Sequence, residues 1–108
     1  MPETSSSIRR QIGSFAPKLA ELTDDVVFGD IWERPGLSKR DRSLVTVATL
    51  VALYRTEQLD FHLQRAVENG VTVDELIEAI THLAFYAGWP NAMTAIRRAQ
   101  ALFDDHST

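Results

Sequence analysis

The stretch from Leu44 to Leu53 constrains the fold more than any other part of this sequence. It is apolar on every side of a helix, is interrupted only by two threonines, and is too short to span a bilayer. A helix that is hydrophobic all round must be covered all round, and a chain of 108 residues has little other material with which to cover it. We therefore expect copies of the chain to associate as a homo-oligomer.

The remaining periodicity predicts an all-α fold of five to six helices in a single domain over residues 1–108. Residues 1–7 are polar and predict a flexible arm, and residues 17–103 predict the core. No convincing strand pattern is present. We expect helices over approximately residues 8–15, 17–31, 38–54, 57–69, 73–87 and 90–103.

Capping signals support these boundaries. Ser38 and Thr56 are suited to N-cap the helices that follow them. Thr72 and Glu75 have the spacing of a capping box, which is the clearest local signal in the chain. Gly88 is expected to end the fifth of the predicted helices, directly before a proline that begins the sixth.

Composition excludes several classes of function. The chain has no cysteine, so disulfides and thiolate chemistry are absent. Its formal net charge is −4 and no basic face is evident, which makes nucleic acid a poor partner. The amino-terminal residues have no apolar signal-peptide region, so we expect a soluble cytoplasmic protein with no membrane partner. The three histidines are far apart in sequence, and we expect no metal site.

His62 is the first candidate for chemistry. On a helix it lies beside Leu59, Leu63 and Ala66, at or near the apolar side. A half-buried histidine has a shifted pKa and a defined partner, which suits proton transfer. The alternative is a histidine at the edge of the core that one hydrogen bond satisfies, and spacing alone favours that alternative.

An aromatic group is the second candidate. His82, Phe85, Tyr86 and Trp89 recur at helical spacing along a second face of the helix predicted over 73–87. Such a face can line a pocket for an organic ligand. Ordinary core or subunit interface is the alternative, because tryptophan and tyrosine are enriched at both.

Polar residues at the turn before His62 form the third candidate. Arg55, Glu57 and Gln58 lie where two predicted helices meet. Arg55 can clamp a substrate carboxylate with two hydrogen bonds, or it can form a surface ion pair of little worth. Arg40 and Arg42, earlier in the chain, can bind a carboxylate in the same way or simply be solvated.

Five blocks at consistent spacing make the sequence resemble the γ-carboxymuconolactone decarboxylases. The resemblance covers roughly residues 17 to 103. The blocks are Phe28 to Leu37, Arg42 to Thr46, Arg55-x-Glu57-x-Leu59-x-x-His62-Leu63, Asn69 to Thr72, and Tyr86-x-Gly88-x-Pro90. The resemblance implies an alkylhydroperoxidase-like helical bundle in an oligomer, with a trimer or hexamer expected. It also implies cofactor-independent removal of carbon dioxide from a small carboxylated lactone formed in aromatic-acid breakdown.

By this resemblance the helix pair around Arg55 and His62 lines the active site. Arg55 would hold a carboxylate, His62 would supply a proton, and Glu57 would orient His62 or relay the proton. The residues expected to bind the substrate, a small carboxylate or aromatic ligand, are Arg42, Gln58, His82, Tyr86 and Trp89. The alternative function is a family relative that binds a small aromatic or quinone-like ligand without decarboxylating it.

Thiol peroxidase activity, found elsewhere in the same superfamily, is excluded by this sequence. That chemistry needs a Cys-x-x-Cys pair followed four residues later by histidine, and the two cysteine positions correspond to Arg55 and Gln58. The assisting acidic residue would fall near Ser43. Only the histidine, His62, is retained.

Overall fold

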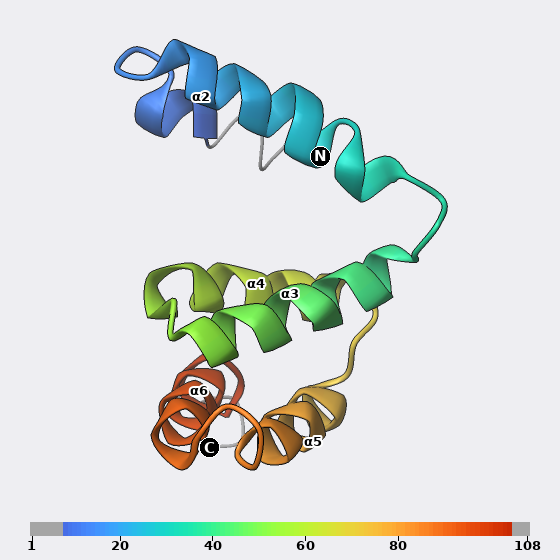
Figure 1. Ribbon diagram of the computed structural model, residues 1–108, viewed down its shortest axis with the longest axis vertical. Helices are drawn as coiled ribbons and strands as arrows, with labels where there is room; N and C mark the ends of the chain where they lie inside the picture. Colours follow the sequence, from blue (N-terminus) through green and yellow to red (C-terminus); the bar gives the residue numbers. More distant parts are fainter. Residues whose placement is uncertain (1–7, 105–108) are drawn as a thin grey trace. The chain divides into compact units, whose positions relative to one another are not determined.

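The computed structural model describes residues 8–104, and all the regular secondary structure in that range is helical (Figure 1). The all-α prediction is therefore confirmed for this part of the chain. The predicted flexible arm, residues 1–7, lies outside the described residues. Contacts divide the chain into two compact units, Met1–Lys39 and Arg40–Thr108, and each is described by itself.

The first unit changes helix type along its length. After a helical stretch at residues 8–12, α2 (Pro17–Leu22) passes directly into a π-helix, η1 (Thr23–Phe28), which a short 3₁₀ helix, η2 (Ile31–Glu33), follows. The sequence had predicted one helix from Pro17 towards Ile31, so the α-helix ends earlier than expected.

One local contact at the end of η1 is compatible only with glycine. A Cβ on Gly29 would lie 2.7 Å from the carbonyl oxygen of Asp24. The wide turn can close only because that residue is glycine.

The second unit holds the main hydrophobic core in four helices: α3 (Lys39–Leu53), α4 (Thr56–Glu68), α5 (Val73–Leu83) and α6 (Trp89–Phe103). Figure 1 shows α5 and α6 below α3 and α4 in that view, and α6 packs against both α4 and α5. The buried apolar residues come from all four helices and from one loop: Val47, Val51, Leu59, Leu63, Ala66, Val71, Leu76, Ile80, Ala92, Ala95 and Ala99. Alanines supply the α6 side of the core, which lets that helix approach its neighbours closely.

Helix α3 buries only one stripe of its surface within the chain. Its fully covered residues are Ser43, Val47 and Val51, whereas Val45 and Leu53 are each 58% exposed. The apolar surface that the sequence predicted to need a cover is therefore not covered by the other helices of the second unit. The homo-oligomer expected from that surface stays a prediction.

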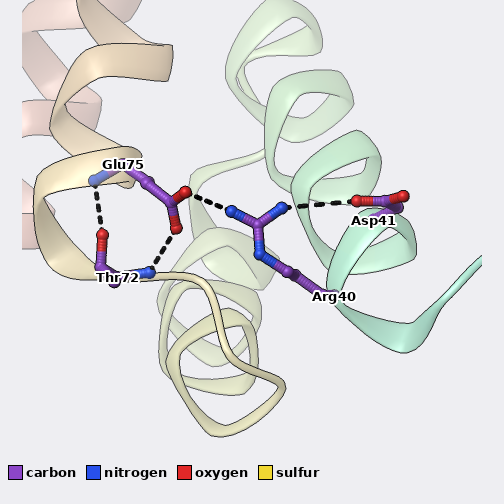
Figure 2. A network of polar contacts seen from close by, with 4 residues as sticks. All are labelled: Arg40, Asp41, Thr72 and Glu75. Atoms are coloured by element: carbon purple, nitrogen blue, oxygen red, sulfur yellow. Dashed lines mark hydrogen bonds and ion pairs between the residues drawn. The ribbon is translucent and has the colours of Figure 1, made fainter.

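The capping box predicted at the start of α5 is confirmed. The Thr72 hydroxyl accepts a hydrogen bond from the Glu75 backbone N–H at 3.0 Å, and the Glu75 carboxylate accepts one from the Thr72 backbone N–H at 2.9 Å. Arg40 donates to the same carboxylate and also to Asp41, so α3 and α5 are joined by one polar network (Figure 2). The Thr72 backbone N–H and then Arg40 hold the pKa of Glu75 below its usual value.

Two boundary predictions in this unit are wrong. Helix α4 begins at Thr56 itself, with Arg55 as the N-cap residue and no side-chain cap hydrogen bond. Helix α5 ends at Leu83 and not near residue 87. Backbone hydrogen bonds beyond it, such as Tyr86 N–H to the Leu83 carbonyl at 3.0 Å, join residues three positions apart and not four, which tightens the turn. Gly88, at φ +108°, then redirects the chain into α6.

None of the helices described between residues 8 and 104 has the length and hydropathy needed to cross a membrane.

Candidate active site

The turn between α3 and α4 sets the position of the first candidate group. The backbone N–H of Tyr54 donates to the Val51 carbonyl at 3.2 Å, and that of Arg55 donates to the Leu50 carbonyl at 2.9 Å. This pair of bonds is a Schellman motif, whose central residue must adopt a left-handed conformation. Tyr54 occupies that place with φ +60°, although glycine is the usual residue there. The motif places Arg55 directly at the amino terminus of α4.

Helix α6 holds this turn from outside. The Asn91 side-chain amide donates to the carbonyls of Val51 at 3.0 Å and Ala52 at 3.2 Å, which satisfies two acceptors at the end of α3. The Tyr54 phenol lies 3.3 Å from the Thr94 hydroxyl. The start of α4 is therefore fixed by contacts with residues about forty positions later in the chain.

Two of the predicted site residues share one face of α4, and a third precedes the helix. Gln58 and His62 are four residues apart, which brings their side chains onto the same side of the helix. Arg55 is the N-cap residue, with a non-helical ψ of 72°. Arg55 and Gln58 are exposed, and within residues 8–104 neither side chain makes a hydrogen bond or ion pair. Glu57 lies roughly 140° around the helix axis from His62, so no direct contact between these two residues is expected within one subunit. The orienting role expected of Glu57 stays a prediction.

His62 is half-buried, as the sequence predicted. Its ring meets the edge of Phe61 at a centroid distance of 4.9 Å and an interplanar angle of 87°. Burial lowers the pKa of His62 from its usual value, and the positive charge of Arg65 lowers it further. The imidazole is therefore neutral near pH 7, and it is a stronger acid than a free histidine once it is protonated.

The aromatic candidates form two ring pairs and not one helical face. His82 stacks on Tyr86 at a centroid distance of 4.7 Å, and Phe85 meets Trp89 edge-on at 5.7 Å. The prediction of one continuous face is wrong, because α5 ends at Leu83 and Trp89 already belongs to α6. Tyr86 is 78% exposed and Phe85 is 74% exposed, so these rings are not core residues of the single chain.

His82 also lines a groove of about 420 Å³ between α3 and α5. Its apolar wall is made by four side chains: Leu44, Ala48, Ala79 and Leu83. Its charged residues are Arg40, Glu75 and Glu78. Neither Arg55 nor His62 is among the residues of this groove, so it does not bring the two candidate groups together. Arg42, half-buried on α3, is not among them either.

Several residues that shape the site were not found from the sequence. Tyr54 gave no turn signal, because tyrosine is rarely left-handed. Asn91 is distant in sequence from the carbonyls it binds. Ser43, fully buried, accepts a hydrogen bond from the Asn69 amide at 3.0 Å and ties the end of α4 to α3. The only sequence signal for Ser43 was that it lies near the position of the assisting acidic residue of the peroxidases. In residues 8–104 no three His, Cys, Asp or Glu side chains gather closely enough to hold a metal ion.

Comparison with known proteins places this geometry in context. The sequence model of the carboxymuconolactone decarboxylase family matches residues 17–101. A 4-carboxymuconolactone decarboxylase from Acinetobacter baylyi is 47% identical over 78 residues, which are 72% of this chain and 58% of that protein. A nitrosuccinic acid decarboxylase from Metarhizium robertsii is 35% identical over 85 residues, which are 79% of this chain and 59% of that protein. The chain thus spans less than two thirds of the length of both relatives.

Proposed function

The chain belongs to the carboxymuconolactone decarboxylase family, and we propose on that premise that it is a carboxy-lyase that removes carbon dioxide from a small carboxylated substrate without a cofactor. The observation that supports the proposal is the group of residues at the first turns of α4. His62, half-buried with a lowered pKa, shares one side of the helix with Gln58, and Arg55 is the N-cap residue of the same helix. Neither Arg55 nor Gln58 has a partner among residues 8–104.

The reaction requires a proton donor, and His62 is the candidate for that role. When the carbon–carbon bond breaks, its electron pair stays on the substrate carbon and carbon dioxide leaves, so the carbon must then take up one proton. The neutral imidazole of His62 cannot give that proton at once. A substrate carboxylate beside it favours the imidazolium form and raises the pKa of His62. We propose that His62 gains a proton when the substrate binds and delivers it to the carbon.

Arg55 and Gln58 are assigned to substrate binding. 4-Carboxymuconolactone and nitrosuccinic acid, the compounds in the names of the two relatives, both carry two carboxyl groups. A decarboxylase removes one carboxyl group and must hold the other. The guanidinium of Arg55 can form two hydrogen bonds to a retained carboxylate, and the amide of Gln58 can donate one more. We propose a lactone of the 4-carboxymuconolactone type as the substrate.

We also propose a homo-oligomer, a trimer or hexamer, in which other copies of the chain cover the open apolar surface. The exposed side chains Val45 and Leu53 of α3 support this, as do the exposed rings at the end of α5. Size-exclusion chromatography with light scattering tests it, and a monomer at micromolar concentration would contradict it.

The decarboxylase proposal is tested by measuring carbon dioxide release from 4-carboxymuconolactone and from nitrosuccinate. We expect turnover of the lactone, a loss of about a hundredfold or more in kcat for His62→Gln, and kcat/KM that falls as the pH rises above the pKa of His62. His82→Gln is the matched control, and we expect it to retain the pH profile. If the wild-type protein releases carbon dioxide from neither compound, the proposal is refuted.

One observation favours a second candidate function, the binding of an aromatic ligand without decarboxylation. The stacked His82–Tyr86 pair is exposed and can take a further ring on its open side. Fluorescence of Trp89 and its neighbours during titration with protocatechuate tests this. Saturable quenching, with no turnover of either carboxylated compound, would favour the second candidate over the first.

A further inference from the structure

A polar pocket lies between α4 and α6, on a side of α4 that His62 does not face. Its volume is about 350 Å³. It is lined by Asp60 of α4 and by five residues of α6: Thr94, Arg97, Arg98, Ala101 and Leu102. Asp60 and His62 are two positions apart on one helix, which separates their directions by roughly 160° around its axis. The pocket is therefore distinct from the face assigned to decarboxylation.

The pocket carries an excess of positive charge. Arg98 donates to one carboxylate oxygen of Asp60 at 3.0 Å and keeps further N–H donors. Arg97 makes no side-chain hydrogen bond or ion pair with any residue between 8 and 104. The pocket lining thus holds two arginines and a single carboxylate. Guanidinium groups bind carboxylate and phosphate oxygens in paired hydrogen bonds.

One acceptor in the pocket keeps capacity for a further donor. The Asp60 side chain is 45% exposed, and among the described residues its oxygen Oδ2 accepts a hydrogen bond from Arg98 alone, whereas Oδ1 is covered. A carboxylate oxygen has two acceptor positions, so a ligand hydroxyl can donate to Oδ2.

The wall of the pocket is also coupled to a strained residue. Thr94 lies 3.3 Å from the phenol of Tyr54, whose backbone is held in the left-handed region. Strain of this kind persists where the surrounding structure imposes it, and it is concentrated at functional sites.

We propose that this pocket binds a small oxyanion, a carboxylate or phosphate, that also carries a hydroxyl group. The anion contacts Arg97 and the remaining donors of Arg98, and the hydroxyl donates to Asp60. This site is independent of the proposed decarboxylation and is tested separately.

Isothermal titration calorimetry of the full chain with L-malate, succinate and inorganic phosphate tests the proposal. Malate and succinate differ by one hydroxyl group, so malate is expected to bind roughly tenfold more tightly. Phosphate shows whether the anion can equally be a phosphate. Arg97→Gln is expected to weaken malate binding by about tenfold.

Two variants serve as controls for the loss of charge and for binding at the reaction face. Arg10→Gln removes the same charge from the first unit, and Arg55→Gln removes the cation assigned to carboxylate binding at the reaction face; neither is expected to change malate binding at the pocket. Circular dichroism of each variant checks that its helices remain. The proposal is overturned if none of the three compounds binds saturably at millimolar concentration. It is overturned equally if Arg10→Gln weakens binding as much as Arg97→Gln, if Arg55→Gln abolishes binding, or if succinate binds the Arg55→Gln variant as tightly as malate does.

Discussion

Replacement of Tyr54 should reverse the usual ranking of alanine and glycine. Inside a helix, alanine is the more stabilising of the two residues. Tyr54 ends α3 at φ +60°, where a Cβ is crowded and glycine has no such conflict. We therefore expect the Tyr54→Gly variant to be more stable than the Tyr54→Ala variant, although both lose the same ring.

The size of the difference follows from two opposing contributions. Holding a residue with a Cβ in the left-handed region costs about 1–2 kcal/mol, whereas the greater freedom of glycine in the unfolded chain costs about 0.5–1 kcal/mol. Glycine at position 54 should then exceed alanine by about 0.5–1 kcal/mol in the free energy of unfolding. For a domain of this size that corresponds to about 2–8 °C in Tm.

Urea and thermal unfolding followed by circular dichroism measure this difference. Tyr54→Phe isolates the phenol group, which lies 3.3 Å from Thr94 at an exposed position. Its loss should therefore cost only about 0.5 kcal/mol. Gln64, exposed in the middle of α4, is the control position, where alanine should be more stable than glycine by about 1 kcal/mol. If alanine matches or exceeds glycine at position 54 as well, the argument from backbone strain is wrong.

Four further predictions concern stability and function. Leu63→Ala, at a fully buried core position, should lower the free energy of unfolding by about 3 kcal/mol, measured by urea titration. Thr72→Ala removes one arm of the capping box and should cost about 1 kcal/mol in the same assay. The lowered pKa of His62 means that the folded chain binds fewer protons than the unfolded chain as the pH falls below 6.5, so wild type should lose stability there and His62→Gln should lose less. Arg55→Gln should raise KM by about tenfold or more in the carbon dioxide assay while the pH profile stays unchanged.

Features that depend on a few neighbouring residues could be predicted from the sequence. The capping box at Thr72 and Glu75 is complete within four residues, and its two hydrogen bonds form as expected. The turn after α4 has the same character: Gly70 adopts φ +103°, directly after residue 69, where the predicted helix ends. Neither feature requires knowledge of what packs against it.

Features that depend on distant residues could not be predicted. The left-handed Tyr54 is stable because Asn91 and Thr94, on another helix, hold the turn around it. The passage from α2 into a π-helix is a local feature that was also missed, because a periodicity argument does not detect the close approach of Gly29 to Asp24. For the same reason the aromatic residues were assigned to one face, although α5 ends before most of them.

The half-buried position of His62 was predictable, but the consequence of that burial was not. Periodicity placed the ring beside Leu59 and Leu63, and the structure agrees. Periodicity does not tell whether burial or a neighbouring carboxylate controls the pKa. Burial dominates, and Arg65 adds to it, so the resting imidazole is uncharged. A proton donor that is neutral at rest must acquire its proton from a change in its surroundings, and the arrival of an anionic substrate is such a change. Burial thus removes the charge from the free imidazole and makes proton delivery depend on a bound carboxylate. The chemistry proposed for His62 is therefore limited to substrates that carry a carboxylate.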